Sequence, residues 1–371
     1  MFRTLVSSKE TNGAVSIFQH PDFDGHEHVL FGHDAATGLK AIVAVHNTAC
    51  GPGLGGLRMR DYASEDEALR DVLRLSRGMS YKNAMAGLAH GGGKAVIIGD
   101  PTTARTPALM RAMGRLVDSL GGRYITAQDS GIRVQDLHAL SETTAFVTGL
   151  RASRTPDGEP RTGDPSPATA VGVYHGIRAC LQQVFGSPDP AGRNIAIQGL
   201  GSVGFRLAAA LHGAGARLLV ADIDAGRTRA VQEAFGARVL PIAEIHAAAA
   251  DVYAPCALGG AINRDSIQTL QARIVAGAAN NQLARPEFGT ALHKAGILYA
   301  PDYVINAGGV IDVAAQLGDY DPADVERRVV AIGETLGEIF RQATLDDEPP
   351  EVVADRLAEA RLVRPPPDPG R

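Results

Sequence analysis

The spacing of apolar residues over the first 150 positions predicts strands interleaved with helices. Residues 26–31 and 39–45 have the pattern of strands, and the turn-like Asp34-Ala-Ala-Thr-Gly38 between them predicts a hairpin. A helix is expected to begin at Ser64, where Ser64-Glu-Asp-Glu67 has the capping-box pattern and apolar residues follow at helical spacing. Strands are also expected over residues 95–98 and 124–127, on either side of a helix that begins after Thr106.

The second half of the chain alternates strand and helix patterns more regularly. A loop rich in proline, glycine and charge covers residues 151–167, and we place a domain boundary there. A helix is expected over residues 167–185, and strands and helices alternate after it, which is typical of a parallel, doubly wound sheet. We therefore predict a two-domain α/β protein, divided into residues 1–150 and 151–344. The last long helix is expected over 322–343, a C-terminal helix over 345–363 is expected to pack back on the first domain, and 364–371 are expected to be a disordered tail.

Composition excludes several classes of partner. The 371 residues are 45% hydrophobic and 21% charged, with a formal net charge of −5, so we expect a globular protein without a nucleic-acid surface. No apolar run has the length of a membrane span, and the N-terminus lacks the apolar region of a signal peptide. The three cysteines are too few and too scattered for a disulfide framework. We predict a cytoplasmic protein that does not act at a membrane.

Two lysines and an aspartate are the first candidates for chemistry. Lys94 directly follows the glycines 91–93, and Lys82 lies twelve residues upstream. Glycines permit a close approach of backbone and ligand, and a second nearby cation would lower the pKa of a desolvated lysine until it can act as a base. The alternative is a glycine turn before a strand, with a solvated lysine. Asp129 lies just past the C-terminal end of the predicted strand 124–127, where active groups of open α/β sheets are often found.

A dinucleotide fingerprint begins the second domain. The strand 194–198 leads into Gly199-Leu-Gly201-Ser202-Val203-Gly204 and a helix, and Asp222 ends the next strand 23 residues after the first glycine. In this context the glycines permit the turn, the approach of a pyrophosphate and the packing of helix on strand. Asp222 is expected to accept hydrogen bonds from the adenosine ribose, which favours NAD over NADP. Arg227 and Arg229 leave NADP as the less favoured alternative.

Neither the histidines nor the cysteines predict a further reactive centre. Four histidines lie between residues 20 and 33, but no third ligand has matching spacing, so we expect no metal site. Cys256 has no evident catalytic histidine, and we expect it to be buried beside the cofactor.

The chain resembles the amino-acid dehydrogenases of the glutamate, leucine, phenylalanine and valine group, and among these it is most similar to the leucine and valine enzymes. The resemblance covers about residues 26–361. The motifs that carry it are Gly51-Pro-Gly-Leu-Gly-Gly-Leu-Arg-Met59, Gly78-Met-Ser-Tyr-Lys-Asn83, Gly91-Gly-Gly-Lys94, Thr126-Ala-Gln-Asp129, Pro165-Ser-Pro-Ala-Thr169, Ala254-Pro-Cys-Ala257, Ala279-Asn-Asn281 and Ile305-Asn-Ala-Gly-Gly-Val310. The resemblance implies an N-terminal substrate domain, a C-terminal Rossmann NAD domain and an active site in the cleft between them.

The resemblance also implies roles for individual residues. Lys94 matches the lysine that activates water, Asp129 the acid that moves protons to and from the amino group, and Lys82 the partner of the substrate α-carboxylate. The expected substrate site consists of Lys82, Leu54, Gly56, Ala127, Asn280, Val310 and Val313. The expected cofactor site consists of Gly199, Gly201, Ser202, Val203, Gly204, Asp222, Thr169, Cys256, Ala257, Asn280 and Asn306.

The side-chain pocket is expected to be apolar. In glutamate dehydrogenases, the positions of Leu54 and Val313 hold a lysine and a serine that bind the side-chain carboxylate. Here both are apolar, and Ala127 and Val310 resemble the branched-chain enzymes, so a buried glutamate carboxylate would lack a partner. Departures from the usual pattern, such as Gln128, leave the preferred substrate open.

The predicted function is NAD-dependent, reversible oxidative deamination of leucine, valine and isoleucine, by a homo-oligomer whose partners are the amino acid, the 2-oxo acid and ammonia. The alternative substrate class is aromatic amino acids, which would make the protein a phenylalanine dehydrogenase. A catalytically silent NAD-binding regulatory protein on the same fold is the alternative from another class, although Lys82, Lys94 and Asp129 are all intact.

Overall fold

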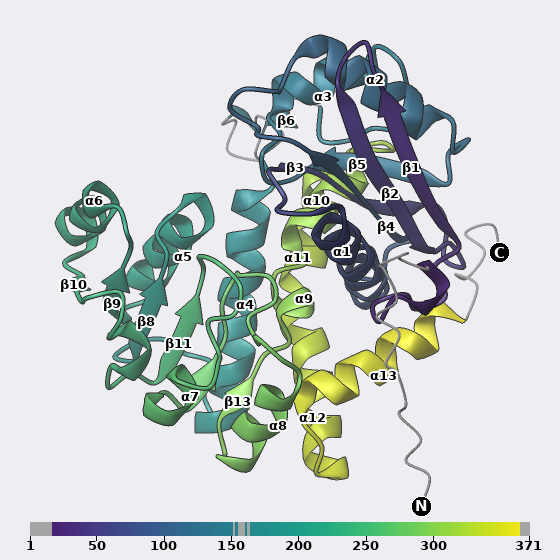
Figure 1. Cartoon of the computed structure of the whole chain (residues 1–371). Coiled ribbons are helices and arrows are strands. Elements are labelled where there is room, and N and C mark those ends of the chain that lie inside the picture. The colour runs from purple at the N-terminus through teal and green to yellow at the C-terminus, as the bar shows by residue number, and fades with distance from the viewer. Residues whose placement is uncertain (1–16, 151–152, 155–159, 162–163, 364–371) are drawn as a thin grey trace, which may run out of the picture.

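The protein consists of two α/β domains, each built around its own sheet (Figure 1). The computed structural model describes residues 17–150, 153–154, 160–161 and 164–363. The expected disordered tail, 364–371, lies outside the described residues, as do parts of the expected boundary loop. Of that loop, β6 (Ser153–Arg154) and β7 (Pro160–Arg161) form an antiparallel pair.

The first domain contains a five-stranded mixed sheet with the strand order β1-β2-β4-β3-β5. Its strands are β1 (His28–Asp34), β2 (Leu39–Asn47), β3 (Gly53–Arg60), β4 (Gly91–Ile98) and β5 (Tyr124–Gln128). The predicted hairpin is confirmed, because β1 and β2 pair antiparallel, and β2 pairs antiparallel with β4. Strand β3, which runs parallel to both β4 and β5, was not expected, since three glycines weaken its strand pattern.

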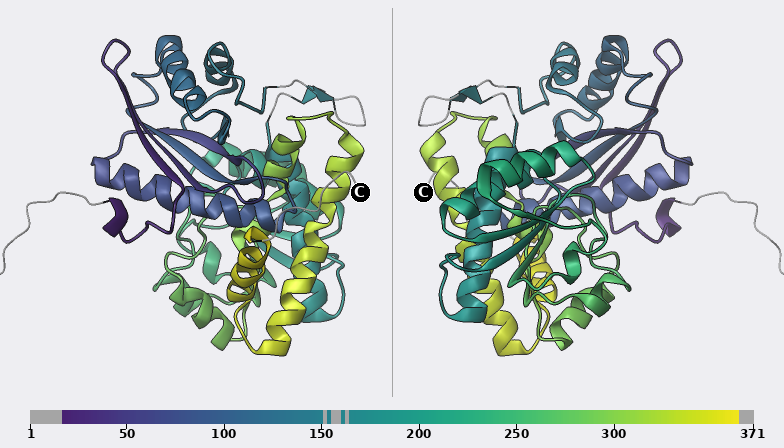
Figure 2. Two further views of the ribbon diagram at one scale, coloured as in Figure 1. Left: turned by 90° about the vertical axis from the view of Figure 1, so that its right-hand side faces the viewer. Right: turned by 90° about the vertical axis from the view of Figure 1, so that its left-hand side faces the viewer.

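Helices cover both faces of this sheet (Figures 1 and 2). The α1 helix (Glu65–Met85) packs on the face that carries Ala44 and Val96. The α2 helix (Pro107–Asp118) and the α3 helix (Val134–Ser141) pack on the opposite face, against Val43, Leu57 and Ala95. Because successive side chains of a strand point to opposite faces, this division determines which residues lie beside α1.

The predicted starts of α1 and α2 are confirmed by their caps. Ser64 Oγ accepts from the Glu67 backbone N–H at 3.1 Å, and Thr106 Oγ1 accepts from that of Leu109 at 3.2 Å. The reciprocal half of the expected capping box differs, because Glu67 accepts from the backbone N–H of Ala63 and not from that of Ser64. The α1 helix places Lys82 in its last turn.

The glycines 91–93 belong to strand β4 and not to a turn. A Cβ at Gly92 would collide with the backbone of Ser80 in α1, and one at Gly93 would lie 2.5 Å from the Tyr124 ring. These glycines therefore permit close packing of β4 against its neighbours, and the alternative of a turn followed by a solvated lysine is wrong.

The second domain contains a six-stranded parallel sheet with the strand order β10-β9-β8-β11-β12-β13, as the alternating pattern predicted. Its strands are β8 (Asn194–Gln198), β9 (Arg217–Ala221), β10 (Arg238–Val239), β11 (Val252–Pro255), β12 (Ile274–Val275) and β13 (Leu298–Tyr299). Its helices are α4 (Ser166–Phe185), α5 (Ser202–Gly213), α6 (Ala225–Phe235), α7 (Ser266–Thr269), α8 (Glu287–Lys294), α9 (Asp302–Ile305), α10 (Gly308–Ala315), α11 (Pro322–Val330) and α12 (Ile332–Asp346). Short 3₁₀ helices cover Ile17–Gln19 and Ile245–Ala247.

Two expected helices have different bounds. The expected helix 322–343 is divided into α11 and α12 at Ala331, whose ψ of −10° departs from α-helical geometry. The expected C-terminal helix 345–363 is shorter, α13 (Pro350–Leu362), because Asp347 has a φ of +53° that ends α12 and prolines follow. The α13 helix packs on α1, so the expected return to the first domain is confirmed (Figure 1).

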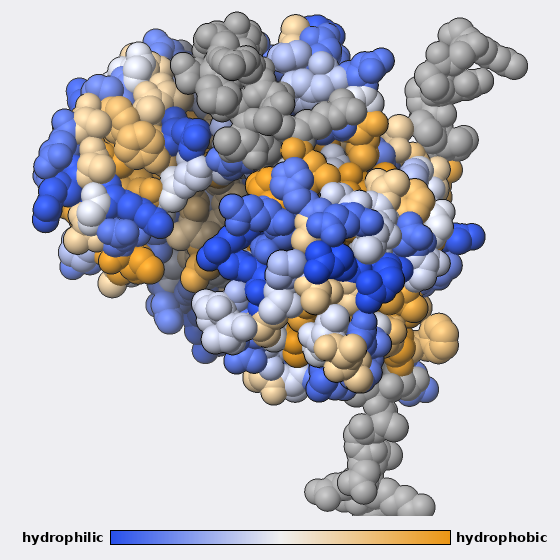
Figure 3. Space-filling view, turned by 90° about the horizontal axis from the view of Figure 1, so that it is seen from above, coloured by the Kyte–Doolittle hydropathy of each residue, from blue (hydrophilic) through white to orange (hydrophobic). Residues whose placement is uncertain are grey.

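The face of the molecule seen from above is mixed in polarity. Seen from above, hydrophilic side chains are interspersed with smaller apolar patches (Figure 3). Within the described residues, no helix has both the length and the apolar character needed to cross a membrane.

Candidate active site

A cavity of about 270 Å³ between the two domains brings most of the predicted site residues together. It is lined by Leu54, Gly55, Gly56, Met79, Lys82, Lys94, Ala127, Gln128 and Asp129 from the first domain, and by Pro165, Ser166, Thr169, Val203, Ala278, Asn280, Asn306, Gly309, Val310 and Val313 from the second. Seven predicted cofactor residues do not line it, namely Gly199, Gly201, Ser202, Gly204, Asp222, Cys256 and Ala257. They lie in or beside the adjoining glycine loop between β8 and α5, and Val203 is in the first turn of α5.

Lys94 and Asp129 form a buried ion pair on the α1 face of the first sheet. Lys94 Nζ lies 2.5 Å from Asp129 Oδ2, and the Lys94 side chain is 7% exposed. The two residues come from strand β4 and from the end of β5, with β3 between them. Gly56 of β3 makes this meeting possible, since a Cβ there would lie 2.7 Å from Asp129 Cβ.

A third charged residue, Arg58, joins this pair and was not predicted. Its Nε donates to Asp129 Oδ2 at 3.2 Å, and its Nη1 donates to Asp71 Oδ2 at 2.8 Å. Burial alone would raise the pKa of Asp129, but Lys94 and Arg58 outweigh it and lower that pKa to about 2. Asp129 is therefore a carboxylate at neutral pH.

Lys82 approaches the cavity from the last turn of α1. Its Nζ donates to Asn280 Oδ1 at 3.1 Å, and the same oxygen accepts from Asn306 Nδ2 at 2.8 Å. Burial lowers the pKa of Lys82, Asp302 raises it and Lys94 lowers it, which leaves it at about 8. The lowered proton affinity was predicted for Lys94, whereas the lowered pKa found here is that of Lys82 and is due mainly to burial; Lys82 remains largely a cation at pH 7.

Leu54, Ala127, Val310 and Val313 form the apolar wall of the cavity, and the remaining lining also includes the polar residues Gln128, Ser166 and Thr169. Leu54 is fully buried, and Ala127 and Val313 are 7% and 8% exposed. Thr148 Oγ1 of the first domain donates to the Val313 backbone carbonyl of α10 at 2.8 Å, so the apolar wall is held together across the two domains. Among the described residues that line the cavity, Lys82 and Lys94 are the only cations.

The glycine loop between β8 and α5 has the shape that a dinucleotide requires. Gly199 has a φ of +100°, and a Cβ there would lie 2.7 Å from Ala257 Cβ. A Cβ at Gly204 would collide with the Gly199 carbonyl oxygen, whereas at Gly201 the nearest atom would be Arg227 Nη1 at 3.9 Å. The helix α5 has no side-chain cap, so its first N–H groups face this open space and suit a pyrophosphate.

Asp222 and Cys256 lie on either side of this loop. Asp222 Oδ2 accepts from the Leu200 backbone N–H at 2.6 Å, and its Oδ1 accepts from that of Asp224 at 2.8 Å. Burial raises the pKa of Cys256 to about 11, so its thiol stays protonated, as expected for a residue that is not a nucleophile. The buried Oδ1 of Asn306, which has no hydrogen-bond partner among the described residues, adds an acceptor for a bound amide. These residues fit a nicotinamide dinucleotide.

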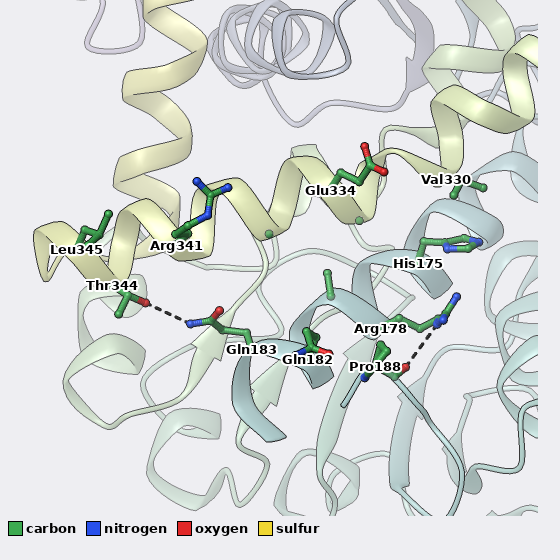
Figure 4. Close-up of a pocket in the computed structure, with 13 residues that line it drawn as sticks. His175, Arg178, Gln182, Gln183, Pro188, Val330, Glu334, Arg341, Thr344 and Leu345 are labelled. Atoms are coloured by element: carbon green, nitrogen blue, oxygen red, sulfur yellow. Dashed lines mark hydrogen bonds between the residues drawn. The ribbon is translucent and has the colours of Figure 1, made fainter. Parts of the chain in front are cut away.

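A second groove lies elsewhere, between α4 and α12 (Figure 4). Gln183 Nε2 donates to Thr344 Oγ1 across it at 3.2 Å, and Arg178 Nε donates to the Pro188 carbonyl at 3.4 Å. None of the predicted site residues lines this groove. No group of three potential metal-ligating side chains occurs among the described residues.

Sequence reasoning missed Arg58, Met79, Thr148 and Gly309. Arg58 follows Leu54 and Gly56 at intervals of two residues along β3, so all three lie on one face of the sheet. This spacing was a signal in the sequence that Arg58 lies beside the site. Met79 precedes Lys82 by three residues and lies on the same helix face. Thr148 acts through a backbone contact 165 residues away in sequence, for which the sequence carries no signal.

Comparison with known proteins gives a consistent result for both domains. Residues 26–146 match the Glu/Leu/Phe/Val dehydrogenase dimerisation domain, and residues 220–317 match the glutamate/leucine/phenylalanine/valine dehydrogenase family. The chain is 46% identical to a leucine dehydrogenase of Geobacillus stearothermophilus, with 94% of each chain covered. It is 47% identical to a valine dehydrogenase of Streptomyces coelicolor, with 94% of this chain and 96% of that one covered. The crystal structure of L-tryptophan dehydrogenase from Nostoc punctiforme is 43% identical and superposes with a TM-score of 0.78, covering 91% of this chain and 96% of that one.

Proposed function

The chain belongs to the glutamate, leucine, phenylalanine and valine dehydrogenase family, and we propose that it catalyses the reversible, NAD-dependent oxidative deamination of branched-chain L-amino acids to 2-oxo acids and ammonia. The observation that carries this proposal is one cavity in which Lys82, Lys94 and Asp129 face an apolar wall. In this assignment residues 1–150 supply substrate binding and catalysis, and residues 151–344 hold the cofactor.

Lys82 would bind the substrate, and Asp129 and Lys94 would transfer protons. Lys82, a cation held by Asn280, would pair with the substrate α-carboxylate. Asp129, ionised and 2.5 Å from Lys94, would accept a proton from the substrate ammonium group. Once it has released its own proton, Lys94 would take a proton from the water that attacks the imino carbon. Asp129 would then return its proton to the amino group and take up the hydroxyl proton of the carbinolamine as it collapses to the 2-oxo acid and ammonia.

The nicotinamide dinucleotide supplies the hydride acceptor for the Cα–H bond. The residues that would hold it are the glycine loop at the pyrophosphate, Asp222 at the adenosine ribose, and Thr169 and Asn306 near the nicotinamide. Asp222 faces the loop as a buried carboxylate, so a 2′-phosphate would meet negative charge and NAD would be preferred over NADP.

The apolar wall supports a branched aliphatic side chain. A glutamate side chain would bury a carboxylate against Leu54 and Val313, and an unpaired buried charge costs several kcal/mol. Valine is one methylene smaller than the isomers leucine and isoleucine, a difference of about 1 kcal/mol, so these substrates should differ by modest factors. We further propose a homo-oligomer assembled through the first domain, whose family model is a dimerisation domain.

The test is NADH formation by the purified protein over a panel of L-amino acids, repeated with NADP. We expect kcat/KM to be highest for leucine, isoleucine or valine, lower for phenylalanine and tryptophan, and lowest for glutamate, with NAD preferred. Highest activity on phenylalanine or tryptophan would assign the aromatic substrate class instead. No oxidation of any amino acid would refute the reaction and leave the silent NAD-binding alternative.

A further inference from the structure

Arg58 connects the acid–base pair to the first helix of the domain. Its Nε donates to Asp129 Oδ2 at 3.2 Å, and its Nη1 donates to Asp71 Oδ2 of α1 at 2.8 Å. The hydroxyl of Tyr62 donates to the same Asp71 oxygen at 2.7 Å. Arg58 therefore bridges two carboxylates that come from different elements.

Arg58 is close to the reacting groups without touching the cavity. It does not line the cavity, and its side chain is 19% exposed. Asp129 Oδ2 is shared, because Lys94 Nζ and Arg58 Nε both approach that one oxygen. The position of the carboxylate thus depends on two cations, and only Lys94 has to give up its proton during the proposed reaction.

The planar guanidinium explains why an arginine suits this place. Its donors form a rigid fork, so Asp71 on one edge fixes the direction of the Nε–H that reaches Asp129. A guanidinium also stays charged throughout the reaction. When Lys94 becomes neutral, Arg58 still holds Asp129 in place and ionised.

We propose that Arg58 is a positioning residue that fixes the Asp129 carboxylate against Lys94, and that Asp71 anchors Arg58 from α1. This assignment rests on the proposed function for its effect on catalysis, but its geometry is independent of the substrate. The charged and titratable groups around the cluster are Lys94 from β4, Lys82, Asp71 and Tyr62 from α1 and the turn before it, and Tyr124 from β5.

The test compares Arg58→Met, Arg58→Lys and Asp71→Asn with the unmodified enzyme. Loss of a charge-assisted hydrogen bond predicts a kcat about tenfold to hundredfold lower in Arg58→Met, with KM for amino acid and NAD within about threefold. Proton transfer should become more rate-limiting, so the solvent deuterium isotope effect on kcat should rise. Arg58→Lys should recover part of kcat, and Asp71→Asn should show a smaller loss of the same kind.

Two further measurements separate positioning from a general loss of structure. Arg193→Met is the matched control, because Arg193 is a half-buried arginine that pairs with Asp251 in the other domain. The Arg193→Met variant should have a lower thermal stability but an unchanged solvent deuterium isotope effect on kcat. A crystal structure of Arg58→Met, or of Asp71→Asn if the first variant does not fold, should show Lys94 and Asp129 separated beyond about 3.5 Å or in several conformers.

The outcomes distinguish the two proposals. An inactive unmodified enzyme would refute the proposed function, and the crystal structure would still decide the role of Arg58. The positioning role is refuted if the Lys94–Asp129 pair stays closed in the variant, if kcat is unchanged, or if KM alone rises.

Discussion

At the residue scale, Lys94 is the group on which the proposed chemistry depends most. It is buried, paired with Asp129, and placed on the face of the sheet that carries the cavity. Lys94→Ala removes the base, so kcat should fall by on the order of 10²-fold or more. NAD binding, measured by fluorescence titration, should be retained, because Lys94 is far in sequence from the glycine loop and is not part of it.

Lys40 offers a matched control for this variant. It lies on β2 of the same sheet and is exposed, so Lys40→Ala should leave kcat unchanged. Near-normal turnover in Lys94→Ala would remove Lys94 from the proposed mechanism, and loss of NAD binding would point to a wider structural defect.

At the element scale, α13 supports the end of α1 that presents Lys82. Arg361 Nη1 donates to the backbone carbonyls of Ala84 and Met85 at 3.1 and 3.2 Å, which satisfies the last turn of α1. Arg361→Ala should therefore reduce the free energy of unfolding by about 1 kcal/mol. Because Lys82 lies in this turn, KM for the amino acid should rise several-fold while kcat changes little.

Arg356 of the same helix serves as the control. It pairs only with exposed carboxylates at the end of α12, so Arg356→Ala should leave both stability and KM nearly unchanged. An unchanged KM in Arg361→Ala would show that α13 supports the fold but not the position of Lys82.

Elements with strong patterns were predictable from the sequence, and elements with weak patterns were not. Strand β8 was predicted residue for residue over 194–198, since its apolar centre is bounded by polar residues, whereas β3 was missed because its glycines carry no pattern. The division of the helix 322–343 at Ala331 was also missed, since neither proline nor glycine occupies that position. Likewise the site residues to which the resemblance assigns a role were predicted, but Arg58, although it lies in the motif 51–59, was not, because its role depends on partners from α1 and from the residue after β5.

At the scale of the whole molecule, a buried histidine pair makes the fold sensitive to acid. The rings of His26 and His46 lie 4.9 Å apart, with Asp24 and Arg77 as the nearest charged groups. Burial and, to a lesser extent, His26 and Arg77 lower the pKa of His46 while Asp24 raises it, which leaves it at about 4. The unfolded chain therefore binds the proton more tightly, so stability is complete above about pH 6.5 and decreases as the pH falls toward 4.

This pKa shift corresponds to about 3 kcal/mol lost between pH 6.5 and 4. Urea unfolding at pH 7.5 and 4.5 measures the loss, and His46→Gln should reduce its dependence on pH. His33→Gln is the control, because His33 is exposed on β1. If His46→Gln and the unmodified protein lose stability equally between these pH values, His46 is not the source of the sensitivity.

The alternation of side chains along the strands of the first sheet limits where the chain can gain or lose residues. Leu54, Gly56 and Arg58 point to the α1 face because they are separated by two residues, as do Ala127 and Asp129 near the end of β5. Deleting or inserting one residue within β3 would exchange both faces at once, placing a guanidinium in the apolar layer beneath α2 and a methionine beside Asp129. Length changes should therefore be tolerated in the connections but not inside β3, β4 or β5, because the number of residues in each strand determines which side chains face the site.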